Sequence, residues 1–134
     1  MTKIEDEEAL KRFISDVEAL HDALLHEAVL LHPGFVDAEG KMLGDFKLPD
    51  ARMIFQSQFE DIAAIQLDLK RVSRFRLEPK GEFRLEGEIG KGEVALFLLG
   101  KDRASVSEIR AAEVGYKVLG NKFWGAGYHL IQND

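Results

Sequence analysis

The sequence predicts an α+β fold in which an N-terminal helix packs on a largely antiparallel β-sheet of about six or seven strands. Two observations predict this class. Apolar residues recur at helical spacing near the N-terminus, and from Ala51 onward they alternate with polar residues in short runs separated by glycines. The length of 134 residues and the hydrophobic content of 46% are typical of one folded domain, so we treat residues 1–134 as a single domain.

Residues 4–20 are predicted to form an amphipathic helix. Thr2 with Glu5 resembles a capping box, and the acidic run at residues 5–8 suits the positive end of a helix dipole. The apolar face at helical spacing consists of Leu10, Phe13, Ile14, Val17 and Leu20.

Residues 21–32 fit two different structures. Leu24, Ala28 and Leu31 would continue the helical stripe, and the Ala, Leu and Glu content favours helix. The same segment also fits the two faces of a mostly buried strand. Periodicity leaves both alternatives open.

The following segment, residues 33–50, is predicted to be a long loop. It begins with Pro33-Gly34, which ends whichever element precedes it, and it contains further glycines and charged residues. One short strand is expected around Phe35-Val36.

The rest of the chain predicts strands joined by tight turns. Ile65, Leu67 and Leu69 alternate with polar residues, and this strand is expected to continue to Leu77 across a bulge near Val72-Ser73. The other expected elements are a strand with Met53, Phe55, Ser57 and Phe59 on one face, a hairpin through Gly90-Lys91-Gly92 joining residues 83–89 to residues 94–99, a strand over residues 106–119, and turns at residues 79–81 and 100–103. Residues 94–99 are apolar on both faces, so we expect them at the centre of the sheet.

The composition excludes several classes of chemistry. The chain has no cysteine, which removes disulfides, thiolate metal sites and cysteine nucleophiles, and this fits a reducing compartment. The acidic N-terminus is unlike a signal peptide, and no apolar run approaches the roughly 18 residues of a membrane span. We therefore expect a cytoplasmic protein that does not contact a membrane.

The acidic charge balance bears on the partner. With 18 Lys and Arg against 24 Asp and Glu, the net charge is −6, which repels phosphate backbones and favours a basic protein partner, although solubility explains it equally well. We predict no nucleic-acid binding, because strand alternation would divide the best basic group between two faces. That group is Lys70, Arg71, Arg74, Arg76 and Lys80.

His21 and Asp22 are the first candidate site residues. One hypothesis makes them an acid/base or ligand pair. The structural alternative, which we favour, is that Asp22 bonds the backbone at a helix–strand junction and His21 is an ordinary hydrogen-bonding residue. Adjacent residues in a strand point to opposite faces, which argues against joint action on one atom.

A metal site is a further hypothesis, because His26 and His32 accompany Glu27. The spacings from His21 to His26 and from His26 to His32 match no helical ligand pair, and in a strand His26 and His32 would lie about 20 Å apart. Asp22 with His26 could chelate only on a helix. We expect no metal and no cofactor.

Other motifs have ordinary explanations. Gly87, Gly90 and Gly92 are turn glycines, because a strand and not a helix follows them. Trp124 and Tyr128, with Phe123, could form an exposed recognition patch or cover one end of the sheet.

Two segments and a late strand form a distinctive pattern. The first segment consists of Leu20-His21-Asp22-Ala23, Leu25-His26-Glu27 and Gly34-Phe35-Val36-Asp37, the second of residues 52–59, 64–67 and 75–79, and the late strand of residues 109–118. This pattern resembles a group of small bacterial proteins with an aromatic-His-Asp motif, similar to the immunity-protein-50 type of polymorphic-toxin immunity proteins. Leu20 stands where the group usually has an aromatic residue. The resemblance covers about half the chain and implies a strand that opens at His21-Asp22 in a sheet-rich fold.

For function, we expect a non-enzymatic protein-interaction domain. The resemblance implies toxin neutralisation, in which the protein covers the active surface of a basic toxin. The alternative is a small-ligand-binding protein or an unrecognised enzyme that uses His21, Asp22 and Glu27, and a third possibility is a homo-oligomer that associates through an edge strand. The candidate binding residues are His21, Asp22, Glu27, Trp124 and Tyr128.

Overall fold

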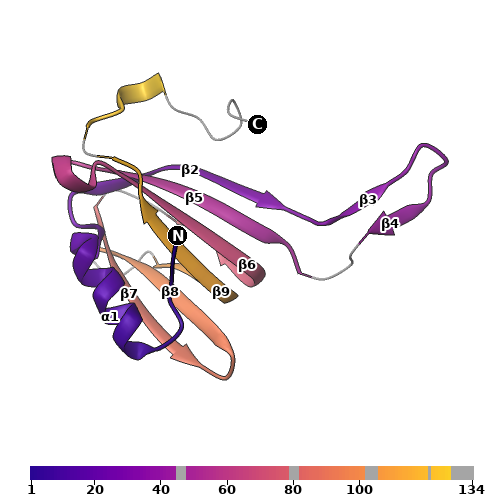
Figure 1. Cartoon of the computed structure of the whole chain (residues 1–134), viewed down its shortest axis with the longest axis horizontal. Coiled ribbons are helices and arrows are strands. Elements are labelled where there is room, and N and C mark those ends of the chain that lie inside the picture. Colours follow the sequence, from indigo (N-terminus) through magenta and orange to yellow (C-terminus); the bar gives the residue numbers. More distant parts are fainter. Residues whose placement is uncertain (45–47, 79–81, 102–105, 121, 128–134) are drawn as a thin grey trace.

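A computed structural model describes residues 1–44, 48–78, 82–101, 106–120 and 122–127. Within these residues the protein is α+β, with one α-helix, α1 (Glu7–Asp16), and a seven-stranded antiparallel sheet, as predicted (Figure 1). The strands are β1 (Thr2–Lys3), β2 (Ala23–Leu31), β3 (Gly34–Val36), β4 (Met42–Gly44), β5 (Asp50–Ser57), β6 (Ala64–Arg76), β7 (Phe83–Gly90), β8 (Glu93–Gly100) and β9 (Val106–Val118). Three 3-10 turns complete the description, η1 (Glu18–Leu20), η2 (Glu60–Ile62) and η3 (Gly125–Gly127).

The sheet has the strand order β2-β5-β6-β9-β8-β7, so β2 and β7 are its two edges. β9 pairs with β6 along one side as far as Val118, whereas β8 pairs with its other side only as far as Ala111. β1 pairs with the part of β9 that β8 does not reach, where Thr2 lies opposite Tyr116. The N-terminal residues are therefore held by a strand that lies more than a hundred positions away in the sequence.

The helix is shorter than predicted. Thr2 belongs to β1, so the predicted capping box is wrong, and Asp6 caps the helix by accepting a hydrogen bond of 2.7 Å from the Ala9 amide. The helix ends at Asp16. The next residues, Glu18–Leu20, have φ angles of 55°, 51° and 56°, so the chain leaves α1 through a left-handed turn.

The core lies between α1 and one face of a strongly curved sheet. Phe13 of the helix packs on Tyr116 of β9, with ring centroids 4.6 Å apart. α1 approaches β7 closely at Gly87, where a Cβ atom would lie 3.1 Å from the Leu10 side chain. On the opposite side from α1, η3 lies beyond β2 and β5, and the Gly125 carbonyl accepts a hydrogen bond from Gln56 (Figure 1).

The segment after the helix is a strand, which resolves the ambiguity over residues 21–32. β2 begins at Ala23, so the expectation that the sheet opens at His21-Asp22 is wrong by two residues. The register of β2 against β5 shifts between Leu25 and Glu27, which places a bulge at His26.

The predicted loop at residues 33–50 contains a hairpin. The expected short strand at Phe35-Val36 is present as β3, and it pairs with a second strand, β4, that was not predicted. The Asp37 carboxylate closes the turn between them by accepting hydrogen bonds of 2.9 Å from the Glu39 and Lys41 amides. The β3–β4 hairpin, here called the arm, projects from the far end of β2 away from the rest of the sheet (Figure 1).

The later strands follow the prediction with small corrections. The bulge in β6 lies between Val72 and Arg74, and Lys91 and Gly92 turn the β7–β8 hairpin with positive φ angles. β8 is paired on both sides, by β9 and by the edge strand β7, so it lies inside the sheet as expected. Phe59 lies beyond the end of β5 and does not share its buried face. The expected turn at residues 79–81, and residues 102–103 of the turn at residues 100–103, fall outside the described residues.

Candidate functional site

His21 and Asp22 lie together in the turn between η1 and β2. The His21 Nδ1 and Asp22 Oδ2 atoms are 3.0 Å apart. The expectation that these side chains diverge assumed a strand. Both residues precede β2, and Asp22 has a φ angle of 56°, which bends the chain so that its carboxylate meets the imidazole.

This turn is conformationally strained and firmly held. Glu18, Ala19, Leu20 and Asp22 are all in the left-handed region, which costs a non-glycine residue about 1 kcal/mol. Leu20 is fully buried, and the Gln58 amide donates a hydrogen bond of 3.0 Å to the Asp22 carbonyl. Burial and backbone pairing therefore hold the His21-Asp22 pair in place.

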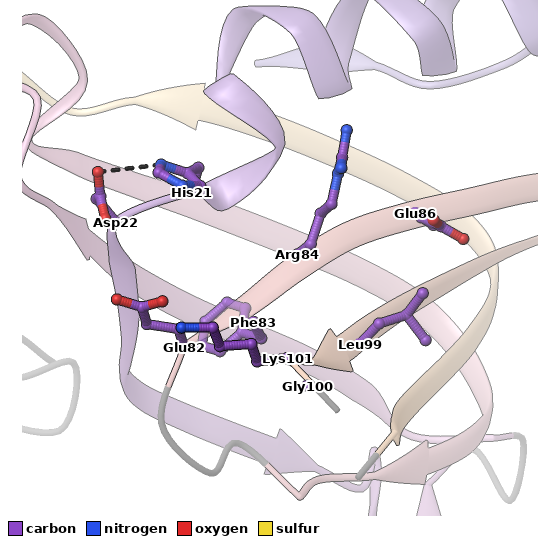
Figure 2. Close-up of a pocket in the computed structure, with 9 residues that line it drawn as sticks. All are labelled: His21, Asp22, Glu82, Phe83, Arg84, Glu86, Leu99, Gly100 and Lys101. Atoms are coloured by element: carbon purple, nitrogen blue, oxygen red, sulfur yellow. Dashed lines mark ion pairs between the residues drawn. The ribbon is translucent and has the colours of Figure 1, made fainter. Parts of the chain in front are cut away.

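A pocket of about 340 Å³ lies beside this pair. Figure 2 shows His21 and Asp22 on the segment before β2, facing the ends of β7 and β8 across the open space. The remaining lining residues are Glu82, Phe83, Arg84, Glu86, Leu99, Gly100 and Lys101.

The pocket is lined by acidic, basic and apolar side chains. Asp22 and two glutamates oppose Arg84 and Lys101, while Phe83 and Leu99 supply apolar surface. Among the described residues, those that line the pocket include no serine, threonine, tyrosine or cysteine and so supply no hydroxyl or thiol nucleophile. The His21-Asp22 pair is suited to hydrogen bonding or proton exchange with a bound polar molecule.

The other predicted site residues lie elsewhere. Glu27 is on β2 opposite Ile54 and does not line the pocket. Trp124 is half-buried just before η3, in the segment that Gln56 holds, and Tyr128 lies outside the described residues. His32 is also separate, because its Nδ1 accepts a hydrogen bond from the Gly34 amide.

The described part of the chain contains no group of three or more His, Asp or Glu side chains that could hold a metal ion. It also contains no helix long and apolar enough to cross a membrane.

A second cavity, of about 520 Å³, was not anticipated from the sequence. It lies where β9 passes from its pairing with β8 to its pairing with β1, beside Ala112 and Glu113. Ile4, Ile89 and Val94 contribute apolar walls. The long-range pairing of β1 creates this opening, so no local sequence pattern indicates it.

The predicted basic group is neutralised by neighbouring carboxylates. Lys70 pairs with Asp50 at 3.3 Å, and Arg74 pairs with Glu108 at 3.5 Å. Arg71 and Arg76 pair with Glu113 and Glu78. Lys80 lies outside the described residues.

Arg110 of β9 is the centre of a cluster of charged side chains. Its guanidinium bonds Glu108 at 2.6 Å and Glu93 at 3.0 Å, and it lies over the Phe97 ring. The hydrogen bond from Arg110 lowers the pKa of Glu108 below its ordinary value, although partial desolvation opposes this effect.

The arm is the largest exposed apolar feature of the described residues. Phe35 faces Leu43, and Val36 faces Met42, and these two cross-strand pairs point to opposite faces of the hairpin. Phe35 is 58% exposed and Met42 is 69% exposed. The exposed large apolar residues from the end of β2 through the arm are Leu30, Leu31, Phe35, Val36, Met42, Leu43 and Leu48.

These features define the class of the protein, which is an α+β protein with a curved antiparallel sheet, a mixed-charge pocket beside a left-handed turn, and a projecting apolar arm. No family model, no curated protein and no solved structure matches the chain.

Proposed function

We propose that the protein is a non-enzymatic protein-interaction domain and that the arm is its contact surface. The observation that carries this proposal is the exposure of apolar side chains on both faces of the arm, at Phe35 and Leu43 and at Val36 and Met42. Exposed apolar clusters of this kind mark interaction sites. A two-stranded hairpin is also marginally stable alone in water, so a partner that covers both faces would stabilise it.

The resemblance to toxin immunity proteins suggests a finer version of this function. The protein would bind a toxin and cover its active surface. The net charge of −6 supports a basic partner, because opposite charges accelerate encounter even where they add little to final affinity. Association with such a partner should slow as the salt concentration rises.

The test is co-purification with the product of the neighbouring gene. A Phe35→Ser/Met42→Ser variant should lose binding by tenfold or more, because it removes one apolar side chain from each face of the arm. Phe123→Ser is the control, since Phe123 is an exposed apolar residue away from the arm. Unchanged binding by the arm variant would contradict the proposal.

A second candidate function is binding of a small polar ligand in the His21-Asp22 pocket. The left-handed turn favours it, because strained backbone is concentrated at ligand sites. Glu82 and Glu86, and not Glu27, supply the nearby carboxylates. Titration of metabolite mixtures should shift the His21 NMR signals, and the effect should disappear in Asp22→Asn. Shifts confined to other residues would exclude this site.

A further inference from the structure

The two edges of the sheet differ in their protection against pairing with another chain. β7 carries the charged residues Arg84, Glu86 and Glu88, and α1 packs beside it. Glu7 of α1 accepts a hydrogen bond of 3.3 Å from the Ile89 amide. Charged side chains and a covering helix are established ways of blocking an edge strand.

Within the described residues, no helix packs against β2, the opposite edge, and β2 carries few charged side chains. It is nine residues long, and Glu27 is the one Asp, Glu, Lys or Arg residue within it. Leu24 at its beginning is 53% exposed and Leu31 at its end is 63% exposed. The bulge at His26 interrupts the strand, which leaves residues 27–31 as its longest regular stretch.

We propose that a second copy of this chain pairs with the β2 edge through residues 27–31, in antiparallel register about a two-fold axis at Val29. This inference goes beyond the proposed function, because it concerns association of the chain with itself through β2 and not the binding of a different protein by the arm. The two sheets would join into one continuous sheet, with Leu31 of each copy opposite Glu27 of the other. Such an interface is self-complementary, as closed dimers require.

This register accounts for exposed leucines at both ends of β2. The arm follows directly after Leu31, so it continues past the bulge and runs beside the first residues of the partner's β2. Phe35 then lies near Leu24 of the partner subunit, and each arm covers an apolar residue that the isolated chain exposes.

The available area agrees with a dimer of ordinary size. At about half exposure, the apolar side chains that this register brings to the contact, Leu24, Leu30, Leu31 and Phe35, offer on the order of 400 Å² per copy. A standard interface buries about 800 Å² per partner, and the paired β2 backbones supply the remainder. β2 contains one carboxylate, so most of the acidic residues behind the net charge of −6 lie outside this contact.

The first test is the solution mass of the full chain, measured by sedimentation or light scattering. We expect twice the monomer mass of 15.1 kDa. Leu31→Glu should give a monomer with an unchanged circular dichroism spectrum, because Leu31 is exposed and the new carboxylate would face Glu27 of the partner subunit. Phe123→Glu adds the same charge at an exposed position elsewhere and should remain dimeric.

The second test uses the absence of cysteine from the chain. In Val29→Cys the two thiols would face each other across the axis at a Cα separation that a disulfide can span, so mild oxidation should give a covalent dimer. Phe123→Cys should give no covalent dimer beyond the small amount that random collision produces. Failure of Val29→Cys to cross-link in a dimeric protein would overturn the proposed register.

The outcomes separate this inference from the proposed function. A monomeric wild-type chain at high concentration overturns the dimer, while loss of partner binding in Phe35→Ser/Met42→Ser would still support the arm as a contact surface. If the arm variant stays dimeric and keeps partner binding, the proposed function fails, while cross-linking of Val29→Cys would still support the β2 dimer.

Discussion

The rings of Phe55 and Phe83 meet edge to face with centroids 6.1 Å apart, although three strands separate β5 from β7 in the sheet. This contact requires the sheet to curve until its buried face closes on itself. Phe83 also lines the pocket that contains His21 and Asp22. The curvature therefore builds the core and brings the start of β7 to the turn before β2.

Truncation of Phe83 should be strongly destabilising. Phe83→Ala removes one ring of the pair from a buried position, and we expect the free energy of unfolding to fall by about 3–4 kcal/mol. Urea denaturation measures this change. Phe123→Ala, at an exposed position, should change stability by less than about 0.5 kcal/mol. Similar values for the two variants would show that the ring contact contributes little.

Tyr116 should make the protein sensitive to alkaline pH. Its hydroxyl donates a hydrogen bond of 2.9 Å to Asp16. Burial, and to a smaller extent this hydrogen bond, raise the pKa of Tyr116. The unfolded tyrosine loses its proton near pH 10, while the folded one retains it to higher pH. The folded state then binds more protons, so the free energy of unfolding should fall as pH rises above about 10.

Tyr116→Phe tests this link. The variant should lose about 1 kcal/mol at neutral pH, because the Asp16 hydrogen bond is absent, and its stability should decline less steeply above pH 10. Thermal unfolding from pH 7 to 11 measures both effects. Parallel pH profiles for wild type and variant would exclude Tyr116 as the source of the alkaline loss.

The left-handed turn predicts opposite effects of one substitution at two alanines. Ala19 has a φ angle of 51°, so Ala19→Gly should raise the free energy of unfolding by about 0.5–1 kcal/mol through relief of strain. Ala9 is in α1, where Ala9→Gly should lower it by about 1 kcal/mol. Chemical denaturation compares the two. Destabilisation by Ala19→Gly would contradict the left-handed conformation.

Glu108 should contribute to acid sensitivity. Because the Arg110 hydrogen bond lowers its pKa, the folded state releases this proton more readily than the unfolded state. The resulting stability is present above the ordinary glutamate pKa and is lost as pH falls through the lower folded value. Glu108→Gln should therefore make stability decline less steeply as pH falls below the ordinary glutamate pKa, and urea denaturation at a series of acidic pH values measures this slope. Equal slopes in wild type and Glu108→Gln would argue against this role.

Local patterns identified much of the fold. Leu10 and Phe13 predicted the buried face of the helix, because helical spacing is a property of a short segment. Gly90-Lys91-Gly92 predicted its hairpin for the same reason, since the turn conformation depends on the residues within it. The helix start was misplaced because Thr2 pairs with distant Tyr116, and a local capping pattern contains no information about that partner.

The candidate site depended more heavily on tertiary structure. The sequence indicated His21 and Asp22 as a polar pair, but the left-handed φ angle of Asp22 decided that they meet, and the curved sheet decided that β7 and β8 enclose them. Phe35 and Met42 looked like ordinary apolar residues. Only the arrangement of the whole chain decided that they are exposed, because burial depends on which other elements pack nearby. The sequence by itself thus determined the fold class and most of the elements, while the pocket and the arm arose from contacts between distant segments.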